Sequence, residues 1–299
     1  MKHALLLILL VMSLPSFAAV TPWVEFTQSN GHIKIPVEIE GVKTYALLDT
    51  GANINAINYR FVDFNKLDLD NGKKFKIAGV YGTELKSSFK NVEVNLFGSD
   101  MELDDLVSMN LGSPSTGLLL GAGFFSQFIV QLDYPNSLMR LVTRDSLDMP
   151  KLANIKMQSQ KGTGLPIVQV VLDGDKTVWL TLDTGNSAGL VMKRNVAESM
   201  GWLEKHHSEQ GILAGVNKAA ITDSFRISSV QFGPFELENV LVTVPSEGES
   251  SNLSSRSSVA GSRIKGKRVQ GLLGFDVLKH FVITIDYKTG RAHVGLPAN

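Results

Sequence analysis

Residues Ala46 to Gly51 read Ala-Leu-Leu-Asp-Thr-Gly, and residues Leu180 to Gly185 read Leu-Thr-Leu-Asp-Thr-Gly. Each Asp-Thr-Gly ends an apolar run of strand length, and each run is preceded by a glycine turn, at Gly41 and Gly174, and by another such run. Asp and Gly after a strand are ordinary turn residues, so a single copy would carry little weight. Two copies in the same local context indicate an internal repeat.

A second pair of similar segments lies downstream. Residues Leu120 to Tyr134 align without a gap on residues Leu273 to Tyr287, with a constant offset (274 − 121 = 286 − 133 = 153). Each segment begins with Leu-Gly, continues through a short helical stretch and ends in a strand that closes on Asp-Tyr. Because the whole order of strand, Asp-Thr-Gly, Leu-Gly, helix and hairpin occurs twice, the sequence predicts two similar lobes.

The apolar pattern between these motifs is mostly that of β structure. Strands are predicted at Ile33–Ile39, Val92–Phe97, Leu165–Leu172, Val240–Val244 and Phe281–Ile285. Short helices are predicted at Gly123–Phe128, Asp276–His280 and Arg194–Met200. We therefore expect an all-β fold of two lobes that face each other, with the active site between them.

The boundary between the lobes is expected near residues 149–160, a segment with Pro150 and little apolar periodicity. This predicts an N-terminal lobe at 19–150 and a C-terminal lobe at 151–299. The interval from Asp to the later Gly is 72 residues in the first copy (121 − 49) and 91 in the second (274 − 183). The extra residues fall within 245–268, whose Ser, Gly and charged residues predict a mobile, solvated insertion loop.

The first 18 residues have the pattern of a secretory signal. Lys2 and His3 precede an apolar run from Ala4 to Leu14, and the small residues Ser16 and Ala18 suit a cleavage site after Ala18. A membrane anchor is the alternative, but a bilayer requires a run of about 20 apolar residues. We expect a cleaved signal peptide at 1–18 and export to the periplasm or the medium.

Composition excludes several classes of function. The 299 residues contain 29 basic and 29 acidic side chains, so no broad attraction to nucleic acid or to an anionic membrane is expected. The absence of cysteine excludes disulfides, thiolate zinc sites and a cysteine nucleophile. We expect a chain that has no cofactor or metal and does not insert stably into membranes.

Paired carboxyls carry the predicted chemistry. Hydrolysis by water needs one group that accepts a proton from the water and another that donates one to the carbonyl oxygen. Two carboxyls about 3 Å apart cannot both ionise easily, so they share one proton and supply both groups. Asp49 and Asp183 are therefore the candidate catalytic residues, without separate roles because such a pair titrates as a unit.

The residues that follow each Asp have supporting roles in this prediction. Gly51 and Gly185 allow tight turns and a close approach of the opposing loop, and their amides are placed to hydrogen-bond the carboxylates. Thr50 and Thr184 offer hydroxyls that could tie the two loops together across the lobe interface. Without such bonds the carboxyls would leave their productive geometry.

These motifs resemble those of the retropepsin-like and pepsin-like aspartic peptidases. Leu47 to Ala52 and Leu118 to Gly121 match the family pattern in the first lobe, and Thr181 to Asn186 and Gly271 to Gly274 match it in the second. The resemblance covers residues 30 to 295, with short lobes as in the retroviral type but both lobes in one chain as in pepsin. Asn186 departs from the usual Ala or Ser, and we expect it to lower activity or to shift the carboxyl pKa values.

The resemblance also implies a flap, a β-hairpin that closes over the substrate. Two glycine-rich segments lie at similar distances after their Asp, Ile77–Thr83 and Gly211–Asn217. The candidate flap residues are Gly79, Tyr81, Gly82 and Gly215. An ordinary surface hairpin is the alternative for both segments.

Other classes of function fit less well. His206-His207 has no partners at helical spacing for a zinc site, and no Gly-x-Ser-x-Gly motif of a serine hydrolase is present. The remaining alternative is a catalytically weak peptide-binding module on the same fold, which would hold a peptide as an added strand. Two facing carboxyls favour the aspartic endopeptidase, because burying them is costly and a binder does not need them.

Overall fold

The computed structural model describes residues 20–79, 82–161, 163–215, 219–249, 251, 258–259, 262–263 and 267–297. The predicted signal peptide at 1–18 and much of the predicted insertion loop at 245–268 lie outside these residues, so neither prediction is tested. None of the helices within the described ranges has the length and apolarity needed to cross a membrane.

The first lobe is built on a ten-stranded sheet, in which nine strands follow the order β11-β10-β3-β4-β13-β5-β12-β9-β6 and β2 pairs with β3. The strands are β2 (Thr27–Ser29), β3 (His32–Ile39), β4 (Val42–Leu48), β5 (Ala56–Asn58), β6 (Asp70–Asn71), β9 (Ser88–Lys90), β10 (Val92–Leu96), β11 (Ser99–Leu103), β12 (Leu106–Met109) and β13 (Thr116–Leu120). Helices α1 (Tyr59–Asn65) and α2 (Ala122–Phe125) and a hairpin of β7 (Phe75–Gly79) and β8 (Gly82–Lys86) complete this lobe.

The second lobe repeats this plan with an eight-stranded sheet, in the order β16-β17-β18-β25-β19-β22-β21-β20, in which β21 also pairs with β17. The strands are β16 (Met157–Ser159), β17 (Pro166–Leu172), β18 (Lys176–Leu182), β19 (Leu190–Met192), β20 (Glu209–Ala214), β21 (Ala219–Phe232), β22 (Phe235–Pro245) and β25 (Val269–Leu273). Its helices are α4 (Arg194–Ser199), α5 (Trp202–Lys205) and α6 (Phe275–Leu278), and a short pair is formed by β23 (Ser258–Val259) and β24 (Ser262–Arg263).

A third sheet joins the two lobes. It has the order β1-β15-β14-β26-β27, with β1 (Val24–Glu25), β14 (Ile129–Asp133), β15 (Leu138–Val142), β26 (Val282–Asp286) and β27 (Arg291–Gly295). The repeated strands β14 and β26 pair antiparallel, with Leu132 opposite Ile283, and both side chains are fully buried. An ion pair of 3.0 Å between Arg144 Nε and buried Asp286 Oδ1 also joins the two repeats.

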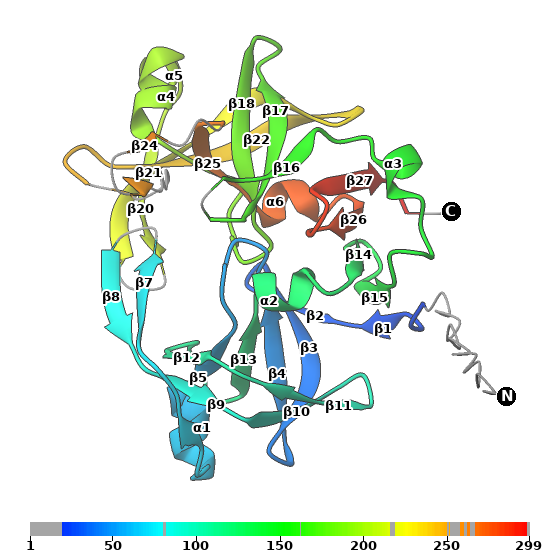
Figure 1. Cartoon of the computed structure of the whole chain (residues 1–299). Coiled ribbons are helices and arrows are strands. Elements are labelled where there is room, and N and C mark those ends of the chain that lie inside the picture. The colour runs from blue at the N-terminus through cyan, green and yellow to red at the C-terminus, as the bar shows by residue number, and fades with distance from the viewer. Residues whose placement is uncertain are drawn as a thin grey trace, which may run out of the picture.

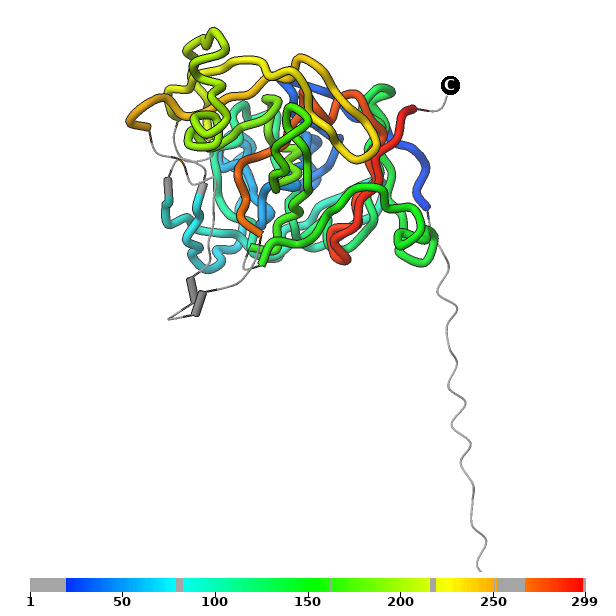
Figure 2. The backbone as a smooth tube through the Cα atoms, turned by 90° about the horizontal axis from the view of Figure 1, so that it is seen from above, coloured from blue at the N-terminus to red at the C-terminus, as the bar shows by residue number. Residues whose placement is uncertain are grey.

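The two lobes lie one above the other, with the shared sheet on one side (Figure 1). The hairpins β7–β8 and β20–β21 extend from different lobes on the opposite side, and both ends of the described chain lie on the side of the shared sheet (Figure 2). The predicted all-β, two-lobed fold is therefore confirmed.

Most predicted elements are present with small shifts of their ends. The five predicted strands correspond to β3, β10, β17, part of β22 and β26, and the three helices to α2, α6 and α4. The prediction missed α1, α5 and α3 (Met149–Leu152), and α3 begins the segment expected to be an irregular connector. Pro150 is compatible with α3 because it lies in the first turn, where a helix does not need its N–H.

Replacing Ile283 by Ala tests how far the shared sheet stabilises the whole molecule. We expect the free energy of unfolding to fall by about 2–5 kcal/mol, because the substitution leaves a cavity between the two repeats. Urea unfolding followed by circular dichroism measures the change. Lys288→Ala, on the exposed hairpin that follows β26, is the control and should change stability by less than about 0.5 kcal/mol. Equal stabilities of the two variants would contradict this role of the sheet.

Candidate active site

Asp49 and Asp183 each extend an inner strand by one residue. In the first lobe β4 pairs parallel with β13, and the N–H of Asp49 donates to Leu120 O at 3.0 Å. In the second lobe β18 pairs parallel with β25, and the N–H of Asp183 donates to Leu273 O at 2.9 Å. The two carboxyls meet between the lobes and are joined by a hydrogen bond. The structure therefore brings the two candidate catalytic residues together.

The glycine after each Asp-Thr pair serves both carboxyls. The N–H of Gly51 donates to Asp49 Oδ1 at 2.9 Å, and the N–H of Gly185 donates to Asp183 Oδ1 at the same distance. A Cβ at Gly51 would lie 2.5 Å from Asp183 Cγ, and a Cβ at Gly185 would be equally crowded against Asp49. Each loop therefore requires glycine, because the carboxyl of the other lobe fills the space of a side chain.

Thr50 and Thr184 cross between the loops through four hydrogen bonds. The hydroxyl of Thr50 accepts from the N–H of Thr184 at 3.0 Å and donates to Leu182 O at 2.7 Å. The hydroxyl of Thr184 accepts from the N–H of Thr50 at 3.0 Å and donates to Leu48 O at 2.8 Å. Both threonines are completely buried, so these bonds have no competition from water.

Burial dominates the electrostatics of the pair. It raises the pKa of Asp49, although the hydrogen bonds from Asp183, Gly51 and Ala52 lower it in part. The pKa of Asp183 is raised well above its usual range, first by burial and then by the neighbouring charge of Asp49. Both shifts favour protonation, so the pair holds a proton at a pH where an ordinary aspartate has lost it.

The Leu-Gly segments support the two Asp loops from behind. Ala122, at the start of α2, donates its N–H to Ala52 O at 2.9 Å, and Phe275, at the start of α6, donates to Asn186 O at 2.9 Å. Gly121 also donates to the side chain of Asn55, with Oδ1 at 2.9 Å. These bonds connect each catalytic loop to the first turn of a helix, which limits its movement.

Asn186 is part of the second loop. Its side-chain Oδ1 accepts from the N–H of Ala188 at 3.1 Å, and its Nδ2 donates to Gly189 O at 3.4 Å. A Cβ at Gly274 would lie 2.5 Å from the main-chain oxygen of Asn186, so this loop and the glycine are closely packed. The backbone N–H of Asn186 lowers the pKa of Asp183, whereas its side chain bonds within its own loop.

Sequence reasoning assigned no role to Tyr134 and Tyr287, which lie close to the pair. Tyr134 packs on Phe275 of the second lobe, and Tyr287 packs on Phe125 of the first, each with ring centres 6.2 Å apart. The pKa of Tyr134 is raised by burial and by Asp183, and that of Tyr287 by burial and by both aspartates. Among the described residues, the buried hydroxyl of Tyr287 has no hydrogen-bond partner. The repeated Asp-Tyr was the sequence signal for this pair.

The candidate flap residues lie on or beside two hairpins. Gly79 ends β7 and pairs with Gly82 of β8, whereas Tyr81 lies outside the described residues. Gly215 directly follows β20. Two β7 side chains, Phe75 and Ile77, pack on a buried cluster of the first lobe. Leu47 and Ala52, on either side of the first Asp-Thr-Gly, pack on the same cluster. The base of the β7–β8 hairpin is thus attached close to the first Asp loop, and the flap role stays a prediction.

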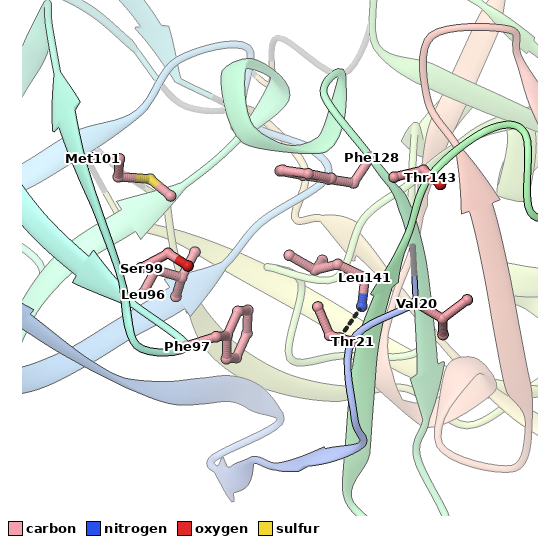
Figure 3. A pocket seen from close by; sticks show the side chains of 9 residues that line it. All are labelled: Val20, Thr21, Leu96, Phe97, Ser99, Met101, Phe128, Leu141 and Thr143. Carbon is pink, nitrogen blue, oxygen red and sulfur yellow. Dashed lines mark hydrogen bonds between the residues drawn. The ribbon is translucent and has the colours of Figure 1, made fainter. Parts of the chain in front are cut away.

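A separate pocket of about 240 Å³ lies in the first lobe, between the N-terminal segment, the β10–β11 hairpin and β15 (Figure 3). Its lining is mostly apolar and consists of Val20, Thr21, Leu96, Phe97, Ser99, Met101, Phe128, Leu141 and Thr143. Thr21 helps to close it, because its Oγ1 accepts from the N–H of Leu141 at 2.9 Å. The pocket includes no residue of either Asp loop.

Comparison with known families agrees with this geometry. Residues 168–277 match a family model described as aspartyl protease, and this range runs from β17 through the second Asp-Thr-Gly to α6. Residues 168–277 therefore belong to an aspartic peptidase family. No curated protein sequence matches it significantly. The first lobe, which lies outside the matched range, repeats the same loop, glycine and threonine contacts.

Replacing Thr50 by Val tests the hydrogen bonds that cross between the two Asp loops. Val has nearly the same shape but leaves the N–H of Thr184 and the C=O of Leu182 buried without a partner. We expect the free energy of unfolding to fall by about 1–3 kcal/mol for each unpaired group, measured by urea unfolding. Thr50→Ser keeps the hydroxyl and is the matched control. A Val variant as stable as the Ser variant would contradict the role of these bonds.

Proposed function

We propose that this chain is an aspartic endopeptidase, in which Asp49 and Asp183 activate a water molecule to hydrolyse peptide bonds. The observation that supports this most strongly is the hydrogen bond between the carboxyls of half-buried Asp49 and buried Asp183, whose loops are held by crossed threonine contacts from two lobes. Such a pair contains a proton acceptor and a proton donor within reach of one substrate carbonyl.

In the proposed reaction the charged carboxyl takes a proton from the water as its oxygen attacks the scissile carbonyl carbon. The protonated carboxyl gives its proton to the carbonyl oxygen, which yields a tetrahedral diol. The carboxyl that took the water proton then gives it to the amide nitrogen. As the C–N bond breaks, the other carboxylate takes a proton from one diol hydroxyl, so one proton again remains between the carboxyls. No covalent bond to the protein forms, so the protein supplies position and proton transfer.

The free-energy cost of burying two ionisable carboxyls supports an enzyme over a peptide-binding module. Burial raises the pKa of both carboxyls, which means that their ionised forms are destabilised by the fold. A binding surface could hold an extended peptide through main-chain hydrogen bonds without such a pair. Strongly shifted carboxyls that face each other are instead typical of catalytic sites.

The remaining features of the enzyme are part of the same proposal. An extended peptide is held near Asp49 and Asp183 beneath the β7–β8 and β20–β21 hairpins, which serve as flaps. Glycines at Gly79, Gly82 and Gly215 provide the backbone freedom for their movement. The mature enzyme is a monomer that is exported after removal of residues 1–18.

Replacing either aspartate by asparagine should abolish peptide cleavage while the protein remains folded. Asn is close to Asp in size but cannot exchange the proton that the reaction needs. A peptide-library digest followed by mass spectrometry measures cleavage, and circular dichroism checks the fold of Asp49→Asn and Asp183→Asn. Asp276→Asn, on the partly exposed α6 helix, is a carboxylate control that should retain activity. Turnover by either catalytic variant, or peptide capture without cleavage by the wild type, would refute the proposal.

The pH dependence should report the second ionisation of the pair. The active form holds one proton, so kcat/KM should fall as the pH rises through the raised pKa associated with Asp183.

The stability of the protein should depend on pH for the same reason, because the fold favours the protonated form of the pair. Its stabilising contribution is present below the pKa of an unfolded Asp and is lost as the pH rises through the raised folded pKa. As the pH rises through the folded pKa, the free energy of unfolding measured in urea should therefore fall less for Asp183→Asn than for the wild type. Parallel stability curves for the two proteins would contradict the shift.

A further inference from the structure

The repeated lobes differ at the position opposite each catalytic aspartate. In the first lobe, β3 and β4 pair antiparallel with Lys34 opposite Leu47, and the same register continued by two residues places His32 opposite Asp49. In the second lobe, Ile167 is opposite Thr181, and the same continuation places Leu165 opposite Asp183. Because side chains opposite each other in a ladder share a face, each aspartate has one such neighbour. One neighbour is ionisable and the other is aliphatic.

The position of His32 is fixed by contacts with the other lobe. His32 begins β3, immediately after a turn in which Asn30 and Gly31 adopt left-handed φ values of 51° and 77°. A Cβ at Gly31 would lie 2.9 Å from Ser187 Cα, so this turn packs closely on the loop that follows Asp183. His32 therefore occupies a half-buried place beside both catalytic loops.

Few charged groups act on His32. The charge of Asp49 raises the pKa of His32, but burial lowers it more strongly and Lys34 on the same strand lowers it further. The interaction is mutual, because His32 lowers the pKa of Asp49. The pKa of Asp183 is shifted by burial, by Asp49 and by the N–H groups of its own loop, without a comparable cation.

We propose that His32 makes the two carboxyls unequal, so that Asp49 carries the negative charge and Asp183 carries the shared proton. In the reaction, which rests on the proposed function, Asp49 is then the base that takes a proton from water. Asp183 is the acid that protonates the carbonyl oxygen. His32 is a positioning residue that acts through Asp49. A protonated imidazole stabilises the adjacent carboxylate, whereas Leu165 gives Asp183 no such support.

The charge link is tested without any measurement of catalysis. Proton NMR titration of the histidine ring signals gives the pKa of His32, and the signal is assigned by its loss in His32→Gln. We expect Asp49→Asn to shift the His32 pKa downward, because the nearby negative charge is gone. Asp183→Asn should not lower it, because Asp49 then ionises alone. An unchanged His32 pKa in Asp49→Asn, or an equal fall in both variants, would overturn the proposal even in an active peptidase.

The catalytic consequence is tested by the pH profile of kcat/KM. His32→Gln should move the acidic limb to higher pH, because Asp49 loses a cation that favours its ionised form. His32→Lys keeps a positive charge and should return the limb toward the wild-type position. His293→Gln, on β27, removes another histidine and should leave the limb unchanged. A uniform loss of rate in His32→Gln without a shift of the limb, or no recovery in His32→Lys, would show a structural role and overturn the proposal.

These two experiments separate failure of this inference from failure of the proposed function. If the wild type cleaves no peptide, the endopeptidase assignment fails, but the NMR titration still decides whether His32 senses the charge of Asp49. If the wild type cleaves peptides and the His32 pKa ignores Asp49→Asn, the endopeptidase assignment stands and the unequal pair is refuted.

Discussion

The site depends on holding two carboxyls against each other in a place where water would otherwise separate and ionise them. The carboxyls belong to loops 134 residues apart in the chain (183 − 49), so local structure alone cannot hold this contact. The crossed bonds of Thr50 and Thr184 do so, because each hydroxyl satisfies one N–H and one C=O of the opposite lobe. A shift of either loop would leave buried polar groups unpaired, so separating the two loops costs free energy.

The rest of the fold can be understood as support for this contact. Asp49 and Asp183 directly follow two inner strands, and the first turns of α2 and α6 hydrogen-bond the loops that contain them. The paired strands β14 and β26, whose side chains are almost all buried, fix the distance between the lobes. Rigid elements therefore position the two carboxyls, whereas the hairpins proposed to cover the substrate lie on the side of the molecule opposite the shared sheet (Figure 1).

Much of this site could be predicted from the sequence, because the same pattern of residues occurs twice and the two copies can be compared. Both aspartates, their glycines and threonines, and the Leu-Gly segments were visible as residues that recur in one order. The pairing of β14 with β26 was not visible, because the offset shows that two strands are alike without showing that they touch. Helices α3 and α5 were missed because each has only four residues, too few to show a helical period. Helix α1 was missed although it follows β5 as the predicted α4 follows β19 in the second lobe.

His32 illustrates the limit of reasoning from repeats. A repeat draws attention to what the lobes share, whereas His32 matters through a difference, since Leu165 occupies the corresponding place. Its relation to Asp49 follows only when the register of β3 and β4 is known. A pair of identical lobes would give its two carboxyls equal surroundings and the proton no preferred position. Duplication within one chain removes that symmetry, because each copy can change alone, and a single cation beside one carboxyl is enough to divide the roles of acid and base.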